Sequence, residues 1–244
     1  MTITDRTTAT KGVPMDSLRK TALIAGVFYV ITFVSIPTLV LYGAVHDPNY
    51  MVGPGPDTPV VLGGVLEIIV ALAGIGTAVV LYPVVKRQGE ARALGFVGAR
   101  VLEAATIFVG VASLLTVVTL RQAGAGADGL VAGQALVAFY DRIFALGQGL
   151  IPAVNALLLG TLLYQSRLVP RALPMLGLIG AALLIATDAA VVFGLLDRLS
   201  PLAAILTIPI AVWEFSLGVY LIVKGFKPSP ITADMTAINN QSTH

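Results

Sequence analysis

Cysteine is absent from the 244 residues of this chain. Its absence excludes disulfides, thiolate metal sites, iron–sulfur clusters and cysteine nucleophiles. Histidine is scarce, since His46 lies in a loop and His244 is the last residue. Bis-histidine haem ligation, a two-histidine zinc motif and a Ser–His pair inside a membrane therefore lack their side chains. We predict no cofactor and no metal site. An intramembrane enzyme is disfavoured, although an acid-only mechanism stays open.

Charge is the second scarcity. Only 11% of the residues are charged, whereas 57% are hydrophobic. A soluble globular domain carries about 25% charged residues, so lipid is the better solvent for this surface. The net charge is +2, and no Lys/Arg run alternates with aromatic residues. That pattern gives no support for a nucleic-acid partner, and the predicted partner is the lipid bilayer.

Long apolar runs are abundant instead. Six of them reach the length of about 20 residues that a bilayer requires. They are Thr21–Leu41, Val60–Val85, Ala93–Leu120, Leu136–Tyr164, Leu173–Leu196 and Leu202–Val223. The predicted fold is all-α, a bundle of six transmembrane helices that occupies residues 19–226. The polar segments 1–18 and 227–244 are predicted to be disordered.

The distribution of Lys and Arg around the runs predicts an orientation. Eleven basic residues flank the spans on the side that carries both termini, and two, Arg121 and Arg198, lie on the other side. Cytoplasmic loops carry the excess of Lys and Arg, so both termini are predicted to be cytoplasmic. Within the fourth run, Gly147-Gln148-Gly149 followed by Pro152 predicts an interrupted helix or a packing kink.

Seven ionisable side chains lie inside the apolar runs: Glu67, Arg100, Glu103, Asp141, Arg142, Asp188 and Glu214. A charge in hydrocarbon costs several kcal/mol unless it is paired, hydrated or neutralised, so each is a candidate functional residue. Arg100 and Glu103 are three positions apart, which predicts an ion pair on one helix face. Asp141 and Arg142 lie near the outer boundary and are predicted to form a solvated interfacial pair, or else to act at a channel mouth.

Three of the acids, Glu67, Asp188 and Glu214, have no base close in sequence. Helical rise places them within about 8 Å of the midpoints of their runs. An arginine from another helix neutralises one of them, or they are protonated, because low dielectric disfavours the charged form of a carboxyl. The open questions are whether they share one cavity and which of them holds a proton. Asn155, in the inner half of the fourth run, is predicted to bridge helices through its amide.

A resemblance covers most of the membrane region. It rests on Arg19–Phe33, Leu66–Gln88, Gly95–Ala104, Ser166–Gly180 and Pro209–Pro228. These stretches resemble the bacterial membrane-protein family called domain of unknown function 4386. The resemblance implies an integral membrane protein of several helices. It implies no reaction and assigns no role to Glu67, Arg100, Glu103 or Glu214, which lie in the matching stretches.

Two functional hypotheses follow. The first is a small transporter that couples to a proton or another cation, with Glu67, Arg100, Glu103, Asp188 and Glu214 as the coupling site. Its partner besides lipid would be a small solute or a proton. The second is a non-catalytic membrane scaffold or accessory protein whose buried charges only fix helix packing. Convergence of the acids on one water-filled cavity favours the first, and separate dry interhelical pairs favour the second.

Overall fold

The computed structural model describes residues 17–197 and 200–233, and all regular secondary structure within them is helical. The elements in chain order are α1 Ser17–Ile31, the 3₁₀ turn η1 Thr32–Ser35, α2 Thr38–Leu41, α3 Thr58–Val85, α4 Glu90–Gln122, α5 Leu130–Phe144, the π-helical turn η2 Ala145–Leu150, α6 Ile151–Ser166, α7 Ala172–Val192, α8 Pro201–Val223 and the 3₁₀ turn η3 Pro230–Thr232. In this part of the chain six helical segments are long and apolar enough to cross a membrane, which confirms the six predicted spans.

Proline and glycine set several of the helix boundaries. Pro37 separates η1 from α2, because a proline supplies no N–H to continue the helical ladder. α8 starts at Pro201, after Ser200, whose hydroxyl oxygen accepts a hydrogen bond from the amide of Ala203 at 3.2 Å. The fifth span was predicted to reach Leu196, but α7 ends at Val192. The reason is Gly194, whose φ of 70° is left-handed and stops the helix.

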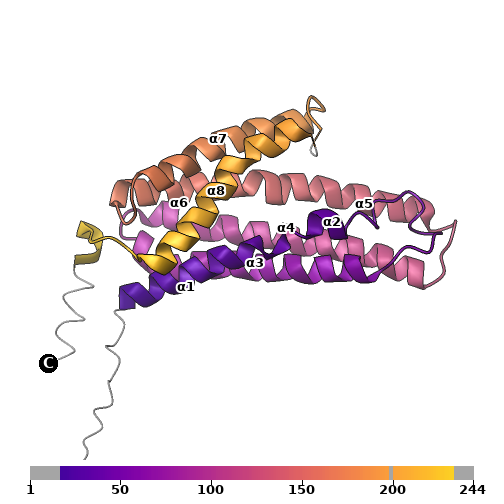
Figure 1. Ribbon diagram of the computed structural model, residues 1–244, viewed down its shortest axis with the longest axis horizontal. Coiled ribbons are helices and arrows are strands. Elements are labelled where there is room, and N and C mark those ends of the chain that lie inside the picture. Colours follow the sequence, from indigo (N-terminus) through magenta and orange to yellow (C-terminus); the bar gives the residue numbers. More distant parts are fainter. Residues whose placement is uncertain (1–16, 198–199, 234–244) are drawn as a thin grey trace, which may run out of the picture.

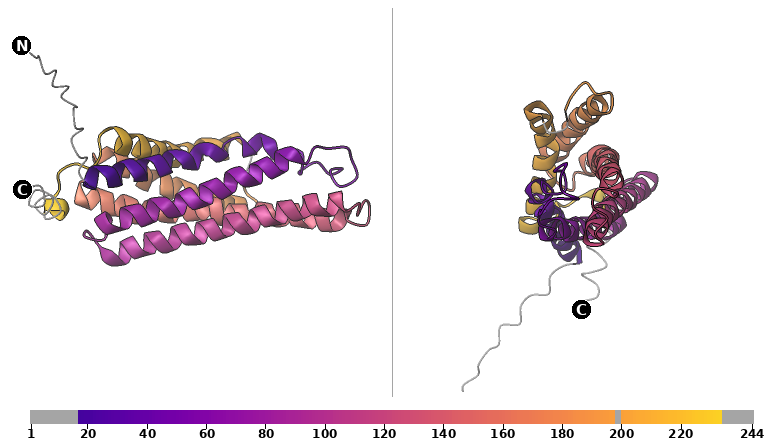
Figure 2. Two further views of the ribbon diagram at one scale, coloured as in Figure 1. Left: turned by 90° about the horizontal axis from the view of Figure 1, so that it is seen from below. Right: turned by 90° about the vertical axis from the view of Figure 1, so that its right-hand side faces the viewer.

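The helices form a bundle with two unlike ends. We call the end where α1 begins and α8 ends the terminal end, and the opposite end, made by loops 42–57 and 123–129, the loop end (Figure 1). α3, α4 and the continuous segment α5–η2–α6 run the whole length of the bundle (Figures 1 and 2). α7 and α8 pair with each other and meet the rest of the bundle at the terminal end. They then diverge from α1 and α3 before reaching the loop end (Figure 1).

Close helix contact holds the terminal end together. A Cβ at Gly26 of α1 would lie 2.6 Å from the carbonyl oxygen of Gly218 in α8, so neither helix has room for a side chain there. Gly177 of α7 likewise admits the ring of Trp213, whose side chain is fully buried. Small residues that let backbones approach are typical of helix association in lipid. The terminal end is therefore tightly packed.

The beginning of the polar tail also packs on the terminal end. The amide of Lys227 donates to the carbonyl of Leu168 at 2.7 Å, and the hydroxyl of Ser229 donates to the carbonyl of Ser166 at 2.6 Å. The segment predicted to be disordered from residue 227 thus begins with residues that make specific contacts. Residues 17 and 18, which were also predicted to be disordered, begin α1. Residues 1–16 and 234–244 of that prediction lie outside the described residues.

A polar cap closes the loop end between α3 and α4. Arg121, in the last turn of α4, forms an ion pair with Asp57, which directly precedes α3. The hydroxyl of Tyr50 donates to Asp57 at 2.7 Å, and the amide of Gln122 donates to it at 3.0 Å. Burial favours a higher pKa for Asp57, but the hydrogen bonds from Tyr50, Gln122 and Arg121 and the charge of Arg121 together hold that pKa below its ordinary value.

Candidate functional site

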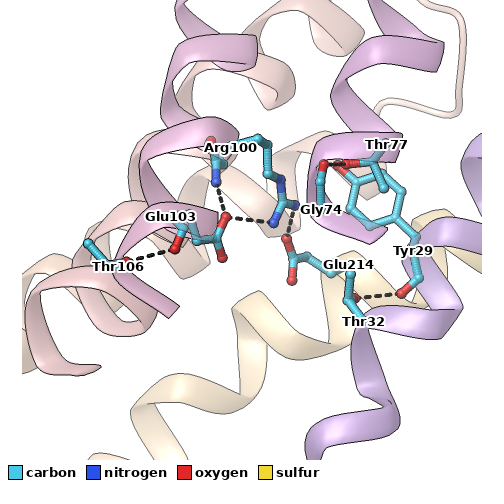
Figure 3. A network of polar contacts seen from close by, with 9 residues as sticks. Tyr29, Thr32, Gly74, Thr77, Arg100, Glu103, Thr106 and Glu214 are labelled. Atoms are coloured by element: carbon cyan, nitrogen blue, oxygen red, sulfur yellow. Dashed lines mark hydrogen bonds and ion pairs between the residues drawn. The ribbon is translucent and has the colours of Figure 1, made fainter. Parts of the chain in front are cut away.

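Arg100 lies at the centre of the polar interior. Its side chain projects from α4 and is only 3% exposed. One guanidinium nitrogen donates to Glu103 at 2.9 Å, and another donates to Glu214 of α8 at 2.6 Å (Figure 3). The predicted pair of Arg100 and Glu103 is confirmed. Glu214 has no base nearby in sequence, but the helix packing supplies Arg100 as its partner, so it is not an unpaired acid.

Asn155 extends this network to a third helix. From α6 its amide nitrogen donates to Glu103 at 2.8 Å, to the same oxygen that Arg100 contacts. The prediction that Asn155 bridges helices is confirmed. Two aromatic rings flank the guanidinium, with Tyr29 of α1 centred 5.5 Å away and Phe96 of α4 5.8 Å away. The network therefore connects α4, α6 and α8, and Tyr29 of α1 packs against it.

Glu67 occupies a separate polar position on α3. Its side chain is 1% exposed. The hydroxyl of Tyr140 in α5 donates to it at 2.9 Å, and the amide of Gln148 in η2 donates at 3.2 Å. Both are neutral donors, in contrast to the guanidinium that meets Glu214. Glu67 and Glu214 therefore have different chemical surroundings, although both are acids in the middle of apolar helices.

The π-helical turn η2 contacts two of the acids, Glu67 through Gln148 and Asp188 through Gly149. Here Gly147 and Gly149 leave space for side chains from two other helices. A Cβ at Gly147 would clash with the hydroxyl group of Thr106, and a Cβ at Gly149 would lie 2.9 Å from Asp188 Oδ1. The predicted interruption of the fourth span takes this form, with helix continuing on both sides. Single π-helical turns of this kind are frequent at functional sites.

A cavity of about 580 Å³ brings most of the candidate residues together. Its charged lining residues are Arg100, Glu103, Asp188 and Glu214. Its polar lining residues are Thr32, Ser35, Gln148, Thr187 and Thr207. Gln148 lines the cavity and also donates to Glu67, which connects the separate acid to this space. The cavity thus holds one base and three acids.

Asp188 differs from the other acids of this cavity. Its oxygen Oδ2 is buried and has no hydrogen-bond partner within residues 17–197 and 200–233. Its carboxylate packs over the bare backbone of Gly149. A buried polar atom without a partner costs about 1–3 kcal/mol, so a proton or a bound group at this position would be stabilising.

A second cavity of about 520 Å³ lies toward the loop end. It is lined by His46, Asp141 and Arg142, and it shares the lining residues Leu39, Phe144, Ala145 and Val191 with the first cavity. The two cavities are therefore adjacent, and the lining residues that they share are apolar.

The structure gives Asp141 a different partner from the one predicted. His46 Nε2 lies 3.2 Å from its carboxylate, whereas Arg142 is exposed. Successive residues on a helix point about 100° apart, which explains why these neighbours face different surroundings.

A metal would need several convergent ligands, and the described residues contain no group of three His, Cys, Asp or Glu side chains that could hold one.

Comparison with known proteins identifies a family. The family model described as Domain of unknown function (DUF4386) matches residues 24–225. The chain belongs to this family. No curated protein and no solved structure matched the chain. The matched range includes Arg100, Glu103, Asp188 and Glu214, but the family description states no activity.

Four residues of the site in this DUF4386 chain were not among the predicted site residues. Gln148 and Tyr140 contact Glu67, Gly149 contacts Asp188, and Tyr29 covers Arg100. Gln148 had a signal in the sequence, because it is an amide between two glycines shortly before a proline in an apolar run. Tyr29 and Tyr140 had none, because a lone tyrosine in an apolar run does not show which distant side chain it will contact.

Proposed function

We propose that the protein is a small transporter of a bacterial cytoplasmic membrane whose central cavity binds a proton or another cation. The observation that carries this proposal is the lining of the cavity, where Glu103, Asp188 and Glu214 face a single arginine, Arg100. A purely structural network would balance its charges, because an unbalanced buried charge is costly. The excess of acid instead provides binding sites for positive charge.

The charge balance of the cavity supports exchange of a proton for another cation, rather than permanent binding of either one. With one base against three acids, the cavity carries a net charge of about −2 when every group is ionised. A proton on one carboxyl removes part of that excess, and a bound cation removes part of it in the same way. Because the two compete for the same negative charge, uptake of one favours release of the other.

The contacts of Arg100 supply a mechanism for coupling. The guanidinium is shared between Glu103 on its own helix and Glu214 on α8. Protonation of Glu214 would remove the charge that holds α8 to Arg100, whereas Glu103 would keep its partners Arg100 and Asn155. The α7–α8 pair diverges from the rest of the bundle (Figure 1). It is therefore the element that we propose moves when Glu214 changes its charge.

The second cavity supports a route to the site from the loop end. His46, Asp141 and Arg142 supply charged groups to its lining, and the apolar residues Leu39, Phe144 and Val191 line both cavities. We infer that these shared apolar residues form a constriction, which acts as a barrier to ions until it widens. In the orientation that we propose, with both termini cytoplasmic, this route begins outside the cell.

Transport can be measured with purified protein in liposomes that contain a pH-sensitive dye. Gradients of Na⁺, K⁺ and tetraphenylphosphonium are imposed one at a time, and proton movement is followed. We expect Glu214→Gln and Asp188→Asn to lower the coupled flux at least tenfold, and Glu67→Gln to lower it less. Asp57→Asn is the matched control, because Asp57 lies outside the cavity and should leave the flux unchanged. Absence of flux with all three cations would contradict the proposal.

The scaffold hypothesis has its own supporting observation. Asn155, Glu103, Arg100 and Glu214 connect α4, α6 and α8 through hydrogen bonds of 2.6–2.9 Å. If the network only fixes packing, Glu103→Gln and Glu214→Gln lower thermal stability in detergent and the wild-type protein carries no flux. If the network serves transport, neutral substitutions abolish flux with little loss of stability, or with a gain. Paired measurements on the same variants therefore separate the two functions.

A further inference from the structure

The central cavity has an opening that faces sideways, toward the position of the lipid. Ile36 and Leu39, at the end of the first span, and Ile208 of α8 all line it. Their side chains are 59%, 74% and 54% exposed, respectively. The opening exists because α8 leaves α1 as it runs toward its N-terminus, so its first half does not close over η1 and α2 (Figure 1). In a bilayer these exposed side chains contact hydrocarbon, which makes the cavity accessible from within the membrane.

The lining of the cavity combines apolar and charged side chains. Ile107, Leu184 and Val191 are among its apolar lining side chains, whereas its charged lining includes Arg100 with the two glutamates that it contacts (Figure 3). A volume of about 580 Å³ falls within the range of about 300–1,000 Å³ that is typical of pockets for small organic molecules. The matching ligand has an apolar body and a positive charge.

A small metal ion fits this lining poorly. Hard cations such as Mg²⁺ and Ca²⁺ take about six or more oxygen ligands at short, fixed distances. Within the described residues no three acidic or histidine side chains converge closely enough for that. Diffuse negative charge beside apolar walls suits a weakly hydrated organic cation instead, because such an ion loses little hydration on entry.

Asp188 is the position where such a cation would bind. Arg100 already engages Glu103 and Glu214, whereas the buried Oδ2 of Asp188 has no hydrogen-bond partner in the described part of the chain. Glu214 lines the same cavity, so a cation at Asp188 also lies in the field of a second carboxylate, whose charge is shared with Arg100.

We propose that the cavity binds hydrophobic monovalent cations, such as quaternary ammonium, phosphonium or protonated amine compounds, which enter sideways between α8 and the end of the first span. The cation occupies the space beside Asp188 and Glu214, and a proton leaves one of these carboxyls as it binds. The substrate class rests on the proposed transport function, but binding itself is measurable without transport.

The test is equilibrium binding of radiolabelled tetraphenylphosphonium to the full-length protein in a neutral maltoside detergent. Triphenylphosphine oxide, which is similar in shape but uncharged, and dodecylphosphocholine, which is zwitterionic like a lipid headgroup, are the competitors. We expect saturable binding that neither competitor displaces, together with release of up to one proton per cation into weakly buffered solution. Asp188→Asn should weaken binding at least tenfold, equivalent to about 1.4 kcal/mol.

Two further variants keep the result interpretable. Asp57→Asn should bind as tightly as the wild type, because Asp57 belongs to the loop-end cap. Ile208→Trp narrows the opening without touching the acids, so it should slow association more than it changes affinity. Elution as a single symmetric peak in size-exclusion chromatography verifies that each variant is folded.

The outcomes separate this inference from the transport proposal. Absence of tetraphenylphosphonium binding, equal binding of the uncharged analogue, or displacement by the zwitterion would each overturn the substrate class. If Na⁺ or K⁺ flux were still present, the transport proposal would stand. Binding that depends on Asp188, without flux of any cation in liposomes, would support the site and overturn transport instead.

Discussion

Two arginine–carboxylate sites in this protein use similar parts and differ in their balance. At the loop end, Arg121 pairs with Asp57 beneath the ring of Tyr50, whose centre lies 4.9 Å from the guanidinium. In the interior, Arg100 pairs with Glu103 and Glu214 beside the ring of Tyr29. The first site has one acid for its base. The second has two, and Asp188 adds a third acid to the same cavity.

The difference teaches what distinguishes a structural ion pair from a site that can respond. Asp57 receives hydrogen bonds from Tyr50, Gln122 and Arg121, all from segments that flank one pair of antiparallel helices. Arg100 instead joins helices that are far apart in sequence and faces an open space of about 580 Å³. Of the two sites, the interior one has more acids than bases and faces a cavity. It also includes α8, which diverges from α1 toward the loop end (Figure 1).

The largest expected effect is removal of the interior base. Arg100→Met leaves Glu103 and Glu214 buried without their cation, and it should lower the free energy of unfolding by about 3–5 kcal/mol. Arg121→Met should cost about 1 kcal/mol or less, because that pair is partly exposed. Unfolding in mixed detergent with increasing dodecyl sulfate measures both. Adding Glu103→Gln and Glu214→Gln to Arg100→Met should restore part of the loss, and no restoration would contradict the charge argument.

The next largest effect concerns the π-helical turn. Gly149→Ala places a methyl group 2.9 Å from the carboxylate of Asp188 and should destabilise the protein by about 1–3 kcal/mol. Gly98→Ala is the matched control, because a Cβ there meets nothing within 4 Å and alanine favours helix by about 1 kcal/mol. Thermal unfolding in detergent compares the two. If Asp188→Ala in the Gly149→Ala background recovered no stability, the clash would not be the cause.

These sites also show what a sequence can predict. The Arg100–Glu103 pair was predictable because a spacing of three fixes two side chains on one helix face. Run length was likewise enough to predict six spans. The bond from Arg100 to Glu214 was not predictable, since it joins residues 114 positions apart and depends on how α8 crosses the bundle. The cavity depends on the same crossing of α8, and no local sequence pattern in α8 predicts the angle at which it crosses the bundle.

One part of the Asp141–Arg142 prediction, the direct pairing of the two side chains, was wrong for a related reason, whereas Arg142 is exposed, as a solvated interfacial residue would be. Adjacency in sequence suggested a pair, but a helix turns about 100° between neighbours, and His46 from a distant loop contacts Asp141 instead. The end of the fifth span was misplaced because the run stays apolar past Val192, whereas the left-handed backbone at Gly194 ends the helix. The apolar composition of a run predicts that it lies in lipid. The position where its helix ends depends on the backbone conformation of individual residues such as Gly194.

A smaller effect is expected at the acid that has neutral partners. Tyr140→Phe removes the hydroxyl that donates to Glu67 at 2.9 Å, and it should cost about 1 kcal/mol of stability. Combining it with Glu67→Leu should cost less than the sum of the single changes, because the two groups interact directly. A double-mutant cycle from unfolding in dodecyl sulfate measures this coupling. Strict additivity of the two changes would show that the hydrogen bond contributes nothing.

The smallest effect tests the loop-end cap through pH. The pKa of Asp57 lies below its ordinary value in the folded protein, because the hydrogen bonds from Tyr50, Gln122 and Arg121 and the charge of Arg121 outweigh the effect of burial. A lowered folded-state pKa contributes stability above the unfolded pKa of about 3.9, and the contribution disappears as pH falls through the folded value. Wild-type protein should therefore lose more stability below about pH 4 than Asp57→Asn does. Parallel melting curves of the two proteins over this range that fail to converge toward acid would show that the ionised form of Asp57 does not stabilise the cap. In that case the contrast with the interior site would rest on geometry alone.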